Sequence, residues 1–150
     1  MKTQEEMMRK MNQLLHGLVF NLHMDHLGFW SEDLNDVLPV DLHLMKMISE
    51  TPDIIIGEIR SALGVPGSTM SSIINRLEKK GLLKRLISAR DRRSYGLKLT
   101  PKGIKIQAEH ERVDLLMAEK ILETLNDQKE RETLIMLLSE VVQNLKTEKS

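Results

Sequence analysis

Three arginines and an aspartate form one uninterrupted run in this chain: Arg90, Asp91, Arg92 and Arg93. A guanidinium group is planar and permanently charged, and it binds phosphate oxygens through paired N–H donors. Arginines at the tip of a protruding loop can hold the phosphates of a duplex or enter its minor groove. The run therefore predicts a site for a polyanion, provided that the flanking segments make it protrude.

A second polar group lies shortly before this run, on a predicted helix that extends to about Lys80. Apolar residues recur there at helical spacing and indicate a face turned to the core: Met70, Ile73, Ile74 and Leu77. The opposite face carries small or hydrogen-bonding side chains: Ser68, Thr69, Ser71, Ser72, Asn75 and Arg76. A helix that enters a DNA groove needs this profile. We expect these six residues, together with Arg90, Arg92 and Arg93, to contact DNA.

A shorter helix and a tight turn must position this helix. Helical spacing over about Gly57 to Leu63 places four apolar residues on one face: Ile56, Ile59, Ala62 and Leu63. Residues 64–67, Gly-Val-Pro-Gly, cannot continue that helix, because glycine favours other backbone angles and proline lacks the N–H donor. Ser68 is then placed to cap the next helix, and Gly81 to end it in a left-handed conformation. The pattern predicts a helix-turn-helix.

After Gly81 the pattern changes from helical spacing to alternation, which is typical of β-strands. Two sets of residues each share one phase of a predicted strand: Leu83, Arg85 and Ile87, and then Tyr95, Leu97 and Leu99. The arginine run lies between these strands, so it forms the tip of a predicted hairpin, or wing.

Together these motifs resemble the winged helix-turn-helix of the MarR family of bacterial transcription regulators. The resemblance rests on the segment STMSSIINRLEKKGLLKR, on the D-x-R element at 91–93 and on the L-T-x-K-G element at 99–103. It extends more weakly to both ends and so covers nearly the whole chain. It implies a mainly α fold with a small β-hairpin wing, in which Asp91 braces Arg93 and the wing arginines reach DNA.

The composition agrees with such a fold and excludes several classes of site. Hydrophobic residues make up 41% of the 150 positions but aromatic residues only 3%, so aliphatic residues and ten methionines must fill the core. The chain has no cysteine, which excludes disulfides and thiolate metal sites. The net charge is zero, yet residues 54–98 carry ten basic and three acidic side chains. The positive charge therefore coincides with the predicted DNA reader.

Predicted helices with long apolar stripes lie on both sides of the winged segment. We expect helices over residues 3–28, 39–50, 101–125 and 127–146, with a loop over 31–36. We treat 1–150 as one domain, with 54–102 as its winged helix-turn-helix and 1–30 and 103–147 as dimerisation helices. MarR-like proteins pair through such helices, which implies a homodimer; an intramolecular bundle in a monomer is the alternative. No signal peptide or membrane segment is evident, so we expect a cytoplasmic protein.

Histidines and carboxylates offer one further kind of site. His110 and Asp114 stand four positions apart on a predicted helix, and His43 opens another. Imidazole and carboxylate groups suit zinc, manganese or iron. This arrangement resembles that of zinc-sensing members of the MarR family. The matching positions are Asp25, His43, His110 and Asp114. The last of them is an aspartate where the resemblance leads us to expect a histidine. A small aromatic or lipophilic effector in the same crevice, between the dimerisation and DNA-binding parts, is the alternative to zinc or manganese.

The leading hypothesis is a dimeric, sequence-specific transcriptional regulator, a repressor, that binds a pseudo-palindromic DNA operator. A winged-helix module that docks a protein instead of DNA is the alternative, although such a module needs no cationic tip. An enzyme is not expected, because the chain lacks a Ser-His-Asp arrangement, a phosphate-binding glycine loop and an H-E-x-x-H motif.

Overall fold

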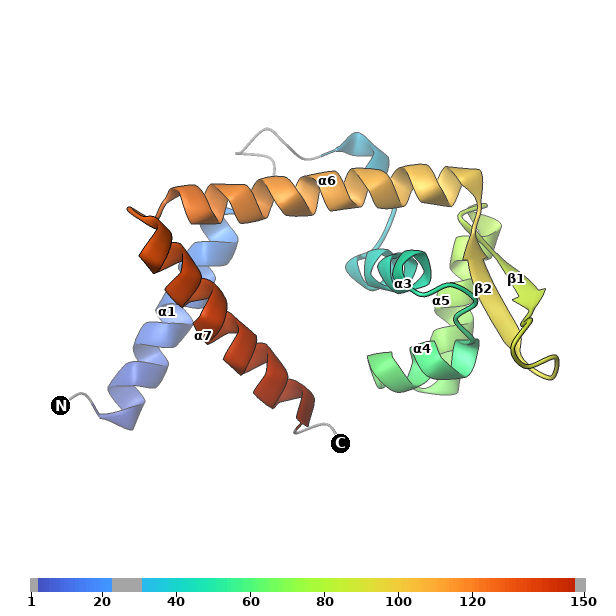
Figure 1. Cartoon of the computed structure of the whole chain (residues 1–150), viewed down its shortest axis with the longest axis horizontal. Helices are drawn as coiled ribbons and strands as arrows, with labels where there is room; N and C mark the ends of the chain where they lie inside the picture. Colours follow the sequence, from blue (N-terminus) through green and yellow to red (C-terminus); the bar gives the residue numbers. More distant parts are fainter. Residues whose placement is uncertain (1–2, 23–30, 148–150) are drawn as a thin grey trace. The chain divides into compact units, whose positions relative to one another are not determined.

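The computed structural model describes residues 3–22 and 31–147 and divides into two compact units, Met1–Val113 and Asp114–Ser150. Its elements, labelled in Figure 1, are in chain order α1 (Gln4–Asn21), η1 (Glu32–Leu34), α3 (Pro39–Glu50), α4 (Ile56–Leu63), α5 (Gly67–Lys79), β1 (Leu83–Ile87), β2 (Tyr95–Leu99), α6 (Pro101–Glu123) and α7 (Gln128–Thr147). The predicted mainly α fold with one hairpin is confirmed. In the described ranges, no helix combines the length and the apolar character that a bilayer span requires.

Helix α1 begins at a capping box. The Thr3 hydroxyl accepts a hydrogen bond from the Glu6 amide at 3.2 Å, and the Glu6 carboxylate accepts one from the Thr3 amide at 2.8 Å. The prediction extended this helix to residue 28, whereas the structure ends it at Asn21, and residues 23–30 lie outside the described part. No residue of α1 is buried, although its apolar stripe is long.

The segment before α3 was predicted to be a loop, and this prediction was wrong. It contains the 3-10 turn η1, and the side chain of Leu34 at the end of that turn is fully buried. One buried leucine in an acidic segment gives no periodic signal, but its burial holds the turn against the core. Helix α3 then starts at Pro39 as predicted, because proline suits the first turn of a helix.

The helix-turn-helix follows with two local corrections. Gly64 ends α4 at a left-handed φ of 63°, which glycine adopts without steric cost. Ser68 does not cap α5: the cap is Pro66, whose carbonyl accepts a hydrogen bond from the Met70 amide at 3.0 Å. The extended backbone of a proline already has the geometry of a helix cap. Ala62, predicted to face the core, is exposed.

The strands β1 and β2 form an antiparallel hairpin, as predicted, and the structure adds its register. Leu83 pairs with Leu99, Arg85 with Leu97 and Ile87 with Tyr95. The first pair is buried and the last pair is exposed, so the hairpin leaves the core as it approaches its tip. Figure 1 shows β2 leading directly into α6.

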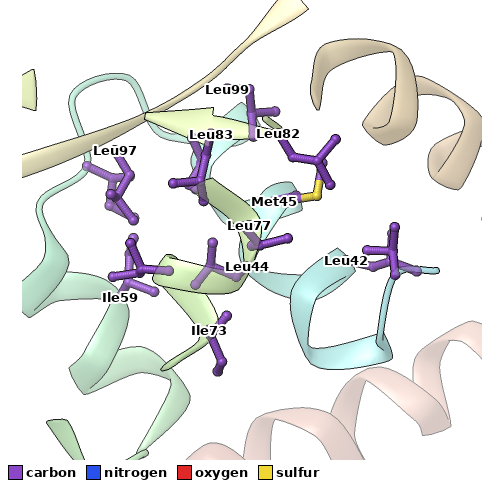
Figure 2. Close-up of a cluster of buried hydrophobic side chains, with 14 of the residues drawn as sticks. Leu42, Leu44, Met45, Ile59, Ile73, Leu77, Leu82, Leu83, Leu97 and Leu99 are labelled. Carbon is purple, nitrogen blue, oxygen red and sulfur yellow. The ribbon is translucent and has the colours of Figure 1, made fainter. Parts of the chain in front are cut away.

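The core lies within the first unit and consists of aliphatic side chains and methionine. Figure 2 shows Leu44 of α3, Ile59 of α4 and Leu77 of α5 pointing toward one another, with Leu83 and Leu97 of the hairpin above them. No aromatic side chain is among the buried residues of the described part. The core therefore joins the helix-turn-helix, the wing and α3 into one body.

The L-T-x-K-G element forms the joint between the wing and α6. The Thr100 hydroxyl donates a hydrogen bond to the Gly81 carbonyl and accepts one from the Gly103 amide at 3.1 Å. A Cβ atom on Gly103 would overlap the carbonyl oxygen of Leu82. The glycine is therefore required by close backbone contact, and this contact places the start of α6 directly against the end of α5.

The second unit contains the end of α6 and the whole of α7. The Asp127 carboxylate accepts a hydrogen bond from the Glu130 amide at 2.9 Å and so caps the start of α7. The Arg131 guanidinium donates to the Leu122 carbonyl at 3.0 Å and so ties α7 to the last turn of α6. No residue of α7 is buried.

Candidate nucleic-acid interface

Helix α5 has the two faces that its sequence predicted. Its four predicted core residues are buried, and the small polar side chains on the other face are exposed: Ser68, Thr69, Ser71, Ser72 and Asn75. Helix α5 therefore presents hydroxyl and amide groups to solvent from a rigid, well-packed base. Such groups can donate and accept hydrogen bonds at phosphates and base edges without steric obstruction.

Arg76, the sixth predicted contact of this helix, has a partner inside the protein. Its Nε donates to Asp41 Oδ2 at 3.0 Å, and its Nη2 binds Asp41 Oδ1. The Asp41 side chain is fully buried, whereas that of Arg76 is 33% exposed. The hydrogen bonds that Arg76 donates to Asp41 raise the pKa of Arg76. Two of its donors thus fasten α5 to α3, and only the remaining N–H groups could reach DNA.

Arg85 of β1 is a functional candidate that the sequence reasoning treated only as a strand residue. Its Nη2 donates to Asn75 Oδ1 at 2.7 Å and lies 3.7 Å from Glu78 Oε2. It therefore orients the amide of Asn75 on the exposed face of α5. The strand phase that Arg85 shares with buried Leu83 was the available signal, because it turns the side chain toward α5.

Arg90, the first of the wing arginines, is bound at the base of the wing. It donates to both carboxylate oxygens of Glu58, at 3.1 and 2.7 Å, and to the Asp53 carbonyl at 2.9 Å. These hydrogen bonds raise the pKa of Arg90 and lower the pKa of Glu58. Arg90 therefore joins the wing to the start of α4, and its guanidinium is largely committed within the protein.

Asp53 organises this region, although the sequence analysis gave it no role. It has a positive φ of 52°, and its Oδ2 accepts hydrogen bonds from the Ser88 hydroxyl at 2.9 Å and the Arg90 amide at 3.1 Å. Aspartate tolerates this left-handed conformation better than most residues. Asp53 consequently fixes the point from which the wing loop departs.

At the tip of the wing, Asp91 braces Arg93 as expected. Asp91 Oδ1 accepts hydrogen bonds from the amide and Nε of Arg93 at 3.0 and 3.4 Å, and its Oδ2 accepts one from Ser94. These hydrogen bonds lower the pKa of Asp91, and the bond from the Arg93 amide has the largest effect. The Arg93 side chain is nevertheless 94% exposed. Arg92 is also exposed and makes no ion pair with any described residue. Two arginines thus project from an ordered loop.

The proposed metal ligands do not gather in the part of the chain that the structure describes. Across residues 3–22 and 31–147, no three histidine or acidic side chains are placed to hold a metal ion. His43 is exposed, while His110 and Asp114 are half-buried on α6. Asp25 lies outside the described residues. The metal site therefore stays a prediction, and no step below depends on it.

Two comparisons of sequence identify relatives of this chain. Residues 39–95 match the profile of the MarR family. A proposed transcriptional regulatory protein for the hcr operon of Thauera aromatica is 34% identical over 95 residues, which cover 63% of this chain. The match spans 57% of that relative's length.

The fold itself is shared with solved MarR-type structures. Streptococcus pneumoniae FabT, solved in complex with DNA, has a TM-score of 0.78 and 27% identity, over 93% of this chain and 97% of FabT. Wild-type MarR from E. coli has a TM-score of 0.62 and 23% identity, over 94% and 98% of the two chains. The profile match covers the helix-turn-helix and most of the wing, and the shared fold extends to both ends. This chain is therefore similar in sequence to the MarR family over residues 39–95 and shares the fold of MarR-type structures.

Proposed function

We propose that this protein is a sequence-specific, DNA-binding transcriptional regulator, and not an enzyme. The observation that carries the proposal is the joint exposure of the polar face of α5 and of Arg92 and Arg93 at the wing tip. The helix supplies groups that can read base edges, and the wing supplies charges that can hold phosphates or enter a minor groove. The relatives support it, because FabT and Staphylococcus aureus MepR were solved in complex with DNA.

The distribution of charge is a second argument for a nucleic-acid partner. The segment 54–98 has ten basic and three acidic side chains in a chain of zero net charge. Within it, Arg76 and Arg90 are paired with carboxylates of the protein, whereas Arg92 makes no such pair. Arg92 and the 94% exposed Arg93 thus place positive charge at the wing tip, where it can attract a polyanion.

We further propose that the regulator acts as a homodimer. Apolar side chains of α1 and α7 are about half exposed in the single chain: Met7, Met11, Leu14, Leu15, Leu18, Leu137, Leu138, Val141, Val142 and Leu145. Stripes of this length are unfavourable in water, and two-fold pairing would bury them. A two-fold dimer would place two copies of α5 about one DNA turn apart, roughly 34–36 Å, which implies a pseudo-palindromic operator.

In this proposal the protein represses genes next to its operator, and an effector changes its affinity for DNA. The effector is either a small lipophilic or aromatic molecule or a divalent metal. It can act only if its affinity differs between the conformation that binds DNA and the conformation that does not.

A winged-helix module that docks a protein is the competing function. The two differ in their response to salt, because phosphate contacts release counterions and protein contacts do not. A regulator must lose duplex affinity steeply as salt rises.

Replacing Arg92 or Arg93 with alanine is expected to weaken binding to a duplex selected from a random library. Each substitution removes one exposed phosphate-binding charge, so the slope of log affinity against log salt should fall by about 1. Fluorescence anisotropy at several salt concentrations measures both quantities. The control is Arg9→Ala, an arginine on α1 whose side chain is 78% exposed, which should leave affinity and slope unchanged. Wild-type affinity that does not depend on salt would refute DNA binding itself.

Introducing a charge into the apolar stripe of α7 is expected to dissociate the dimer. Leu138→Glu places a carboxylate where the proposed interface is apolar, and its desolvation opposes pairing. Sedimentation equilibrium should give twice the 17.3 kDa chain mass for the wild type and a smaller average mass for the variant. Gln143→Glu adds the same charge at an exposed polar position of α7 and should remain dimeric. A monomeric wild-type protein would exclude the dimer and leave the DNA-binding proposal standing.

A further inference from the structure

The side-chain amide of Asn75, on the exposed face of α5, is held in one orientation by a residue of the wing. Arg85 Nη2 of β1 donates a hydrogen bond to Asn75 Oδ1 at 2.7 Å. A guanidinium group has only donors, whereas an asparagine amide has one acceptor oxygen and two N–H donors. The oxygen must therefore be the atom that faces Arg85. The Nδ2 donors are then the part of the amide that is left for another molecule.

Arg85 is held against α5 by a second group as well as by Asn75. Glu78 lies three residues after Asn75 on the same helix, and its Oε2 is 3.7 Å from Arg85 Nη2. The side chains of Arg85 and Glu78 are 36% and 31% exposed, so water reaches this pair only in part. The strand that carries Arg85 is itself fixed, because Leu83 of β1 is buried in the core. The cation therefore stays beside the amide oxygen.

The fixed oxygen limits which base the amide can recognise. The usual partner of asparagine in the major groove is adenine, whose N6 donates to the amide oxygen while N7 accepts from the amide nitrogen. In this protein Arg85 already donates to that oxygen, and its positive charge would repel the N6–H donors of adenine. Guanine presents two acceptors, N7 and O6, at the same edge. An amide that offers only donors beside a cation is therefore complementary to guanine.

The other polar groups near Asn75 do not make this choice. Ser71 and Ser72 lie one turn earlier on α5 and are exposed. A hydroxyl group rotates and can either donate or accept, so serine contacts either kind of base edge. The preference for one purine over the other is therefore a property of the Asn75 amide and of the residue that fixes it.

We propose that Arg85 is a positioning residue for base recognition, which fixes the Asn75 amide so that this position of α5 selects guanine over adenine. The inference rests on the proposed DNA-binding function, because it assigns the base that one residue of that site reads. Arg85 acts through Asn75 and need not touch the DNA itself.

The first measurement uses the free protein, without DNA. Relaxation of the ¹⁵N nucleus of Asn75 Nδ2 reports how far the amide moves on the picosecond-to-nanosecond scale. We expect a high order parameter in the wild type and a low one in Arg85→Met, which keeps the aliphatic stem but removes the donors. Arg85→Lys restores a cation that only donates and should return the order parameter toward the wild-type value. An amide that is equally mobile in the wild type and in Arg85→Met would overturn the inference.

The second measurement is the base preference of the full-length protein. Selection from a random duplex library gives the preferred sequence, and competition with all four base pairs at each of its positions gives the ratios of affinity. At one position we expect guanine to bind about tenfold more tightly than adenine in the wild type and in Arg85→Lys. Arg85→Met should lower this ratio to about twofold or less, because the freed amide can turn its oxygen to adenine.

Two further variants assign the effect to Asn75. Asn75→Asp has the same shape but no donors, so it should abolish the guanine preference at that same position. Lys84→Met removes a cation from an exposed neighbouring position of β1 and is the control for charge. It can lower the overall affinity, but it should leave the ratio of guanine to adenine at the wild-type value. Melting curves establish that each variant is folded.

The pattern of losses separates this inference from the proposed function. If Asn75 contacts a phosphate, Arg85→Met and Asn75→Asp will weaken all duplexes by the same factor and change no base ratio. That result would overturn the inference while DNA binding stands, as would a preference for adenine at the position that responds to Asn75→Asp. If the wild type binds no duplex at all, the proposed function fails and the base assignment fails with it. The relaxation measurement then still shows whether Arg85 fixes the amide.

Discussion

Gly103→Ala is expected to destabilise the folded protein by about 3 kcal/mol, because overpacking against backbone cannot be relieved by a change of rotamer. The added methyl group would overlap the Leu82 carbonyl oxygen and would approach its carbonyl carbon to 3.0 Å. Relief requires α6 to move away from the end of α5, which would also strain the hydrogen bond between Gly103 and Thr100. Thermal unfolding followed by circular dichroism should show a Tm lower by roughly 6–12 °C.

Gly57→Ala is the matched control for this substitution. Gly57 also lies in a helix, but a Cβ atom there would meet nothing within 4 Å. Alanine should therefore stabilise α4 by about 0.5–1 kcal/mol through the smaller conformational freedom of the unfolded chain. If Gly103→Ala unfolds at the wild-type temperature or above, the close contact between α6 and Leu82 is not present in solution.

Asp41→Ala is expected to cost about 3 kcal/mol of folding free energy, at the lower end of the range for breaking a buried ion pair. The substitution leaves the two-thirds-buried guanidinium of Arg76 without its carboxylate. It also removes the acceptor for the Leu38 amide, which Asp41 Oδ2 binds at 3.3 Å at the start of α3. Urea denaturation, with its midpoint and slope, measures the loss.

Glu5→Gln tests whether burial is responsible for the effect of Asp41→Ala. The Glu5–Arg9 pair has an N–O distance of 2.6 Å, but its side chains are 74% and 78% exposed. Its removal should cost at most about 0.5 kcal/mol, since water solvates both groups when they separate. Equal losses in the two variants would show that the Asp41–Arg76 pair does not hold α5 to α3 as the geometry indicates.

The two substitutions also concern the proposed function, since both act on the position of α5. Arg76 attaches α5 to α3. Gly103 allows α6 to start directly against the backbone of Leu82, shortly after the end of α5. A helix that reads base edges must be held within a fraction of an ångström of its working position. We therefore interpret these two contacts as supports of the exposed polar face, although neither reaches it.

Much of the fold could be predicted from the chain alone, because its signals are local. The spacing of Met70, Ile73, Ile74 and Leu77 defined the buried face of α5, and alternation predicted the two strands of the hairpin. Two of the predictions that failed concern positions where the chain has no periodic signal. Leu34 is buried in a segment without periodicity. Ser68 does not cap α5, because the backbone of Pro66 already has the conformation of a helix cap.

The residue types of the candidate interface could be predicted, but which of its arginines are paired with distant carboxylates could not. Residue type and position made Arg76, Arg90, Arg92 and Arg93 look equivalent. In the structure the first two bind carboxylates of distant segments, at Asp41 and Glu58, and the last two project into solvent. Pairing across more than thirty residues depends on how helices pack, and no local pattern records it.

The sequence by itself determined the order and type of the elements, the basic character of residues 54–98 and the polar face of α5. These properties follow from periodicity and side-chain chemistry, which act over a few residues. The tertiary structure decided which arginines remain available and that Asp53 anchors the wing loop. Those properties depend on distances between segments that are far apart in the chain, and such distances exist only after the core has formed.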